Sequence, residues 1–199
     1  FRPENQQKAQ ELLRTYDVDI IGIGTSCAFH AEDIYDDAIT QGKIAIDIAK
    51  KMQIPNIRVF GNEVPKGEDE EVVVQRVIQG IEELCQYGQE TGLVNILLEI
   101  HGDFNTIEML QPVTDALGAY SNFGIIWDVE HSYTSYDQDF LPFYESIKPW
   151  IRHVHFKDAT RDRRNRRTIH LPGEGSIPLQ EIYNTLENDG YDSYYSFEW

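Results

Sequence analysis

The chain has 199 residues, of which 41% are hydrophobic and 26% charged, as is typical of a globular domain large enough to bury a core. No stretch approaches the roughly 20 consecutive apolar residues that a membrane span requires. The formal net charge of −17 disfavours long-range attraction to nucleic acid and to anionic membranes, so we expect neither as a partner.

Apolar runs of strand length alternate with segments of helical periodicity along the chain. Strands are predicted at 19–24, 57–60, 94–100, 123–129, 151–156 and 194–199, with a short seventh at 168–171. These runs are mostly continuous in hydrophobicity rather than alternating, which is typical of parallel strands covered on both faces. Helices are predicted at 3–16, 33–52, 74–85, after 105, at 140–147 and at 179–186, the last with Ser176 as its N-cap.

This alternation favours a parallel α/β fold in a single domain over residues 1–199. No G-x-G-x-x-G follows a strand, which disfavours a dinucleotide-binding sheet. A (β/α)8 TIM barrel has eight strands, begins with a strand and closes with a helix, whereas this chain starts on a helical segment and stops on a strand. We therefore expect a TIM barrel that lacks its first strand and last helix in this chain.

Four residues that can bind a metal stand at the ends of four predicted strands: Glu99, Asp128, His155 and Glu198. Each has an ordinary structural explanation, such as a helix cap for the Asp or an arginine partner for a Glu. Together, however, three carboxylates at one barrel mouth would repel one another, and one divalent cation would remove that conflict. Oxygen ligands with one imidazole suit Mn²⁺, Mg²⁺ or Co²⁺, and Zn²⁺ also fits.

Three of these ligands have a polar companion nearby in sequence. His101 completes an E-x-H motif, His131 a D-x-x-H motif and Lys157 an H-x-K motif. Residues i and i+2 of a strand share a face, so His101 and Lys157 should point toward the same mouth. All three are candidate acids, bases or oxyanion-stabilising groups.

The sequence resembles the xylose isomerase-like barrels, on the segments LLEIHGD, IIWDVEHSY, RHVHFKDAT, LPGEGSIPLQEI and GYDSYYSFEW. That superfamily includes sugar phosphate isomerases and epimerases, inosose and dehydroshikimate dehydratases, and the endonuclease IV type of DNA repair enzyme (AP endonuclease family 2). The resemblance extends from residue 19 to the end of the chain. The order and spacing of the motifs are specific to the superfamily rather than to one activity.

The resemblance implies a carbohydrate-metabolising enzyme with one bound divalent metal, such as manganese. Glu99, Asp128, His155 and Glu198 match the four family ligands. His131 matches a substrate-contacting histidine, and Arg161 an arginine that contacts substrate in the 3-epimerases. Barrels of this family often pair, so a homodimer is left open.

Two reaction mechanisms are compatible with this expected metal site. In an isomerase or epimerase, the metal would hold adjacent oxygens of a small ketose and stabilise an enediolate, while Glu99 and Glu198 remove and return the proton. In a dehydratase, His101, His131 or Lys157 would help a β-hydroxyl leave. The E-x-H and H-x-K motifs resemble those of the dehydratases more, whereas Arg161 resembles the arginine of the 3-epimerases. We favour an isomerase or epimerase because it is the broader class.

Two further functions were weighed. A DNA repair enzyme is disfavoured, because the strand at 57–60 ends in Phe-Gly-Asn where that family places a histidine, and because the chain is acidic. A catalytically inactive sugar-binding barrel is disfavoured by the retention of all four candidate ligands.

Two features stay open. An arginine-rich segment is either a solvated loop or a clamp for an anionic substrate group; its arginines are Arg161, Arg163, Arg164, Arg166 and Arg167. The compartment is also open, with the cytoplasm favoured: Cys27 and Cys85 form no disulfide framework, and Phe1 opens no signal-peptide pattern, although a cleaved leader could precede it.

Overall fold

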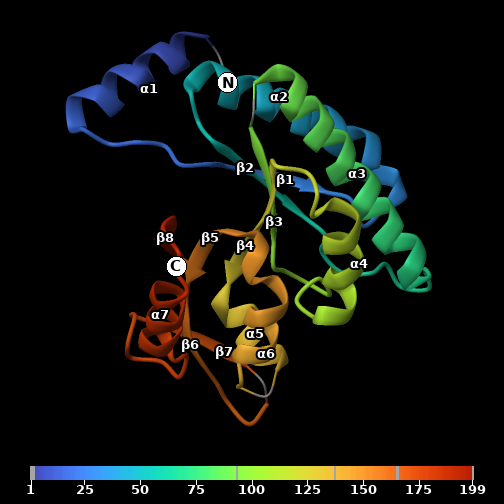
Figure 1. Ribbon diagram of the computed structural model, residues 1–199, viewed down its shortest axis with the longest axis vertical. Helices are drawn as coiled ribbons and strands as arrows, with labels where there is room; N and C mark the ends of the chain where they lie inside the picture. Colours follow the sequence, from blue (N-terminus) through green and yellow to red (C-terminus); the bar gives the residue numbers. More distant parts are fainter. Residues whose placement is uncertain (1–2, 93, 137, 165, 199) are drawn as a thin grey trace.

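The computed structural model describes residues 3–92, 94–136, 138–164 and 166–198. In these residues, a parallel sheet of six strands is flanked by helices (Figure 1). The sheet contains β1 (Ile23–Ala28), β2 (Asn56–Phe60), β3 (Asn95–Glu99), β4 (Phe123–Asp128), β5 (Ile151–Phe156) and β8 (Tyr194–Phe197). The helices are α1 (Pro3–Tyr16), α2 (Tyr35–Met52), α3 (Glu70–Thr91), α4 (Ile107–Leu117), α5 (Val129–Ser135), α6 (Leu141–Ile147) and α7 (Leu179–Asn188), with 3-10 turns η1 (Glu32–Ile34) and η2 (Lys148–Trp150).

The strands follow the order β1-β2-β3-β4-β5-β8, and every neighbouring pair is parallel. All carboxyl ends therefore lie at the same edge of the sheet. Strands β3, β4 and β5 are buried almost throughout, which explains their continuous apolar sequence. Trp127 of β4 is fully buried and stacks on Tyr144 of α6 with ring centroids 5.3 Å apart.

Helices α2, α3 and α4 pack side by side against one face of β1 to β4 (Figure 1). The predicted stripe of α3 is buried, including Val77, Ile81 and Leu84. Asp69 caps this helix by accepting a hydrogen bond from the backbone N–H of Glu71. The apolar periodicity in the sequence thus predicted correctly which face of α3 contacts the sheet.

The parallel α/β class is confirmed, and the six-stranded sheet agrees with the expected partial barrel. Among the described strands, β1 and β8 are the two edges of this sheet and do not pair with each other. That the chain is one domain, lacking a strand and a helix, stays a prediction.

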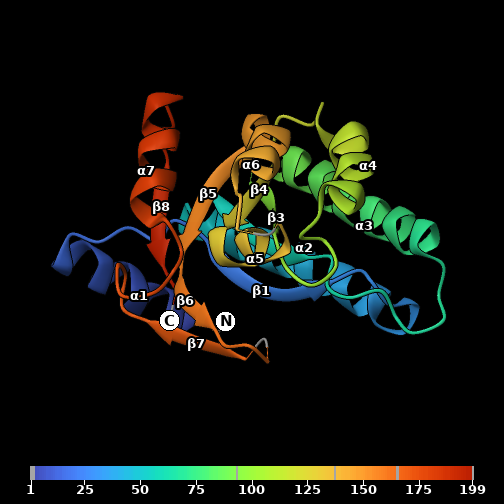
Figure 2. The same ribbon diagram turned by 90° about the horizontal axis from the view of Figure 1, so that it is seen from below.

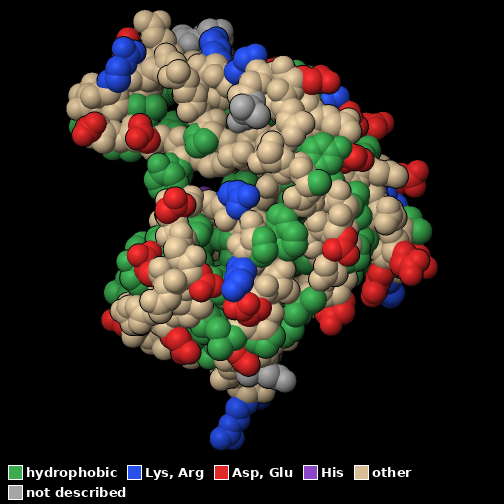
Figure 3. All heavy atoms as spheres, viewed as in Figure 1, with side chains coloured by type: hydrophobic (Ala, Val, Ile, Leu, Met, Phe, Trp, Pro, Cys, Tyr) green, Lys and Arg blue, Asp and Glu red, His purple; other side chains and the backbone are tan. Residues whose placement is uncertain are grey.

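The predicted strand at 168–171 does not join the sheet. It forms β7 (Arg167–His170), which pairs antiparallel with β6 (Asp158–Arg161) in a separate hairpin. Figure 2 shows this hairpin projecting from the body of the sheet beyond β5. A basic side chain extends from the same end of the molecule, whereas acidic side chains gather along the edge that α3 occupies (Figure 3).

Several predicted ends were wrong. Helix α3 runs from Glu70 to Thr91 rather than over 74–85. The first strand starts at Ile23 rather than at Asp19 and continues to Ala28, through an irregular stretch of its pairing with β2 that contains the polar Thr25 and Ser26. Ser176 does not cap α7. Its hydroxyl donates to the carbonyl of Ala159, and Pro178 occupies the N-cap.

The sequence also gave no sign of α5, the short helix directly after β4. Trp199, at the end of the last predicted strand, lies outside the described residues. Within the described ranges, no helix is both long and apolar enough to cross a membrane.

Candidate metal centre

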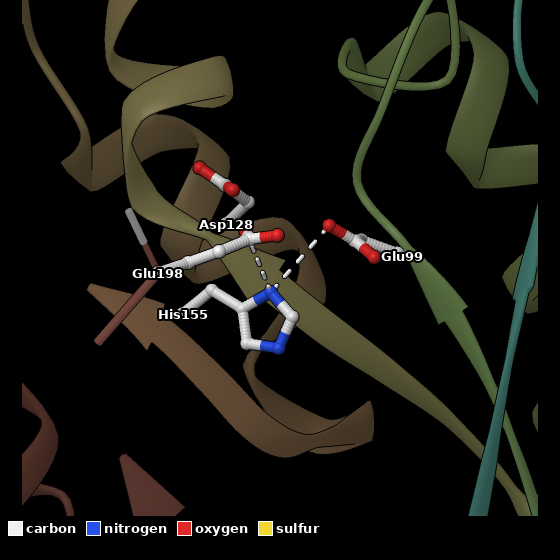
Figure 4. A group of neighbouring side chains, drawn as sticks. All are labelled: Glu99, Asp128, His155 and Glu198. Carbon is white, nitrogen blue, oxygen red and sulfur yellow. Dashed lines mark ion pairs between the residues drawn. The ribbon is translucent and has the colours of Figure 1, made fainter. Parts of the chain in front are cut away.

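Four strands bring the predicted ligands together at the carboxyl edge of the sheet. Glu99 and Asp128 are the last residues of β3 and β4, His155 is the penultimate residue of β5, and Glu198 directly follows β8. One ligand atom from each lies within 4.8 Å of the other three. Figure 4 shows Glu99 and Glu198 pointing toward the His155 ring from different sides, with Asp128 beside them.

His155 lies between two carboxylates. Its Nδ1 is 3.4 Å from Glu99 Oε1 and 3.3 Å from Glu198 Oε2. Burial disfavours the imidazolium, but the two neighbouring carboxylates prevail and raise the pKa of His155 to about 9. The pKa of Glu198 is lowered well below its ordinary value, chiefly by His155 and, against the effect of burial, by Lys157.

The unsatisfied atoms of the cluster fit a bound cation. His155 Nδ1 and Glu198 Oε2 are buried and lack a partner in hydrogen-bond geometry, although charged groups stand within ion-pair distance of each. Buried polar atoms are ordinarily hydrogen-bonded, so two such atoms that lie 3.3 Å apart fit a shared bound cation. Three carboxylates and an imidazole suit a divalent metal.

Asp128 serves both the fold and the site. Its Oδ1 accepts hydrogen bonds from the backbone N–H groups of Glu130, at 3.0 Å, and His131, at 3.3 Å, and so caps α5. Its Oδ2 is turned toward Lys157 and the cluster. The structural reading of Asp128 as a helix cap therefore holds together with its place among the candidate ligands.

Lys157 reaches into the cluster from the residue after β5. Its Nζ lies 2.7 Å from Asp128 Oδ2 and 2.8 Å from Glu198 Oε2. Burial favours the neutral amine, but the Asp128 and Glu198 carboxylates prevail and raise the pKa of Lys157. The side chain therefore remains a cation beside two of the candidate ligands.

The two predicted histidine companions form the rim of the site. The rings of His101 and His131 lie 5.0 Å apart, and the His101 ring contacts Phe60 edge to face at 5.4 Å. His131 Nε2 is 3.8 Å from Asp128 Oδ2. Burial lowers the pKa of His131, which keeps its ring neutral at pH 7.

Arg161 contacts a buried carboxylate next to the cluster. Its Nη2 is 2.9 Å from Glu130 Oε1, and Arg167 Nη1 is 3.2 Å from Glu130 Oε2. Burial raises the pKa of Glu130, but its basic neighbours prevail and lower it. His131 contributes most to this lowering, followed by the two arginines. This carboxylate ties the β6–β7 hairpin to α5 beside the ligand Asp128.

Sequence reasoning missed two charged residues here. Glu130 was overlooked because α5 was not predicted. Arg58, 3.0 Å from Glu99 Oε2, was overlooked within the apolar run Ile-Arg-Val-Phe of β2. The sequence did contain a signal for Arg58, because a single charged residue inside an apolar strand needs a partner of opposite charge. His153 and His170 hydrogen-bond to the hydroxyls of Ser196 and Thr160.

A parallel α/β sheet with side chains able to bind a metal at its carboxyl edge is typical of barrel enzymes, and the sequence match identifies the family. The chain belongs to the xylose isomerase-like TIM barrel family, whose model matches residues 1–199. The resemblance drawn from the strand-end motifs is thereby confirmed.

Relatives of known activity fall into two reaction types. The chain is 23% identical over 203 residues to fructoselysine 3-epimerase of Shigella flexneri, covering 96% of this chain and 72% of that protein. It is 29% identical over 149 residues to inosose dehydratase of Bacillus licheniformis, covering 66% of this chain and 48% of that protein. A structure of the IolI protein with a bound zinc atom superposes with a TM-score of 0.82 at 18% identity, over 97% of this chain and 72% of that one. The relatives are enzymes, and they include both an epimerase and a dehydratase.

Proposed function

We propose that the protein is a divalent-metal-dependent sugar isomerase or epimerase acting on a small ketose or a related sugar derivative. The observation that carries the proposal is the convergence of four ligand atoms within 4.8 Å at the strand ends. Glu99, Asp128, His155 and Glu198 would hold one Mn²⁺, Mg²⁺, Co²⁺ or Zn²⁺. The cation would supply Lewis acidity, making the C–H beside a substrate carbonyl more acidic.

Glu99 and Glu198 are the proposed proton carriers. They reach the cluster from β3 and β8, on different sides of His155 (Figure 4). His155 and nearby cations lower the pKa of both carboxyls despite burial, so both are ionised at pH 7 and ready to accept a proton. One carboxylate would remove the proton from the substrate carbon, and the other would return a proton after taking one up from solvent.

The rim residues would orient the sugar. His131 has a neutral ring beside Asp128, so its nitrogens can donate to and accept from sugar hydroxyls. The Nδ1 of His101 is buried without a hydrogen-bond partner and is available to a substrate oxygen. We also propose a substrate contact for Arg161, which would have to be made while Glu130 holds the same guanidinium.

A dehydratase is the second candidate, and the position of Lys157 favours it. Its ammonium stands 2.7 Å from Asp128 Oδ2 and keeps its proton. A carboxylate of the cluster would remove the C–H proton next to the β-carbon. The Lys157 ammonium could then protonate the departing β-hydroxyl, which leaves as water. The inosose dehydratase similarity is in keeping with this chemistry.

One experiment separates the candidates. The metal-loaded protein would be incubated in D₂O with a panel of ketoses and inososes, and the products analysed by mass spectrometry and NMR. An isomerase or epimerase incorporates solvent deuterium without loss of water, whereas a dehydratase yields a product that has lost one water. Metal binding with neither outcome across the panel would favour an inactive sugar-binding barrel instead.

A further inference from the structure

Arg58 occupies an unusual place for a charged residue. It lies in the middle of β2, paired with Gly24 of β1 and Leu97 of β3, and its neighbours Ile57 and Val59 are fully buried. Arg58 faces the other side of the strand from those two side chains. There it lines a cavity of about 230 Å³, together with Leu97, His153 and His155.

Three contacts hold its guanidinium group. Nη1 lies 3.0 Å from Glu99 Oε2, and Nη2 donates to the carbonyl of Thr25 at 3.4 Å. The guanidinium carbon lies 4.6 Å from the ring centroid of Phe60, which is within cation–π range. The hydroxyl of Thr25 in turn donates to the carbonyl of Arg58 at 2.6 Å, so side chain and backbone are fixed together.

The Arg58 contact makes the two oxygens of Glu99 unequal. Oε2 faces Arg58, whereas Oε1 faces His155 Nδ1 at 3.4 Å. Rotating the carboxylate would separate Oε2 from its cationic partner inside a site where only 3% of Glu99 is exposed. Lys157 lies beside Asp128 Oδ2 and Glu198 Oε2, so its ammonium group does not hold Glu99 Oε2 in this way.

From this geometry we infer that Arg58 is a positioning residue: it holds Glu99 Oε2 and thereby presents Oε1 to the metal. The inference rests on the proposed metal site. This positioning role differs from a purely structural role, in which Arg58 would only neutralise a buried carboxylate and stabilise the fold. Groups that orient a ligand from behind typically contribute about 10- to 100-fold to metal affinity or activity.

The test is Mn²⁺ affinity, measured by calorimetry on the metal-free protein, alongside the melting temperature without metal. Arg58→Gln should weaken Mn²⁺ binding by about 10- to 100-fold. Arg58→Lys keeps the charge but cannot contact Glu99 and Thr25 together. Its Mn²⁺ affinity should therefore lie between that of the wild type and that of Arg58→Gln. The matched control is Arg152→Gln, which should bind Mn²⁺ with wild-type affinity. The guanidinium of this β5 arginine donates to the nearby carbonyls of Pro149 and Ile151.

A lower melting temperature with unchanged Mn²⁺ affinity in Arg58→Gln would overturn the inference and assign Arg58 a structural role. If Arg58→Gln does not fold, Arg58→Lys decides, and wild-type affinity in that variant would equally overturn it. Failure of the proposed function itself gives a different result, because then the wild-type protein would bind no Mn²⁺.

Discussion

The central strands and the edge strand β8 hold the candidate metal centre in different ways. Glu99 and Asp128 stand on strands covered on both sides, and they are only 3% and 0% exposed. Glu198 follows an edge strand, its side chain is 39% exposed, and the preceding Phe197 is 69% exposed. Packing in the core therefore fixes Glu99 and Asp128, and His155, 8% exposed, lies with them, whereas the fourth candidate ligand, Glu198, depends on β5 pairing and on its ionic partners.

This difference suggests separate duties. A ligand locked in the core can hold a cation with little motion, while a carboxylate at the open edge can meet the substrate. Glu198 contacts both His155 and Lys157, so it links the ligand set to the residues that would handle protons.

The largest expected effect comes from Glu198→Gln. Removing its charge takes away a ligand and a proton carrier, and general acid–base groups contribute about 10²- to 10⁴-fold to rate. We expect a fall of at least that size in turnover, measured with a substrate identified in the D₂O screen. Glu187→Gln is the matched control, since Glu187 accepts a hydrogen bond from the Tyr195 hydroxyl of β8 and is not one of the four candidate ligands. Full activity with full metal content in Glu198→Gln would show that the site is misplaced.

Stability should show the same contrast between core and edge. Trp127→Ala removes a fully buried ring that packs on Phe140 and Tyr144, and should cost about 3–5 kcal/mol of unfolding free energy. Phe197→Ala removes a mostly exposed ring and should cost less than about 1 kcal/mol. Urea denaturation of both variants measures the difference. Equal losses would mean that β8 is covered in solution by something that buries Phe197.

Metal uptake should depend on pH through His155. The raised pKa, about 9, means that metal-free His155 carries a proton at pH 7, and a metal ligand must be neutral. Mn²⁺ affinity should therefore rise with pH, by about tenfold per unit for one released proton, and level off above about pH 9. Calorimetry in buffers of different ionisation enthalpy counts the protons released. An affinity that stays flat between about pH 6 and about pH 8 would contradict this reading of His155.

The comparison also explains what the sequence could predict. Parallel strands place their carboxyl ends at one edge, so Glu99, Asp128, His155 and Glu198 could be grouped from strand boundaries alone. Contacts between neighbouring strands could not be predicted from the sequence. Arg58 contacts Glu99 because β2 lies beside β3 in the sheet. The end of β1 was missed because the polar Thr25 and Ser26, in an irregular stretch of its pairing with β2, give no apolar signal.

The β6–β7 hairpin gives the same lesson in another form. The short apolar stretch at 168–171 has the length of a sheet strand, yet its partner is the neighbouring segment Asp158–Arg161. The arginines at 161 and 167 resembled a clamp for an anion, and the structure places both on the buried Glu130. A local pattern does not show which distant carboxylate will accept an arginine.

Metal content tests the central claim most directly. Purified protein would be dialysed and analysed for Mn, Co, Mg and Zn, beside an Asp128→Ala variant whose folding is verified by circular dichroism, because Asp128 also caps α5. We expect about one divalent metal per wild-type chain, retained on dialysis or regained on adding Mn²⁺, and lost in the folded variant. No metal in the wild-type protein even after Mn²⁺ is supplied would contradict it.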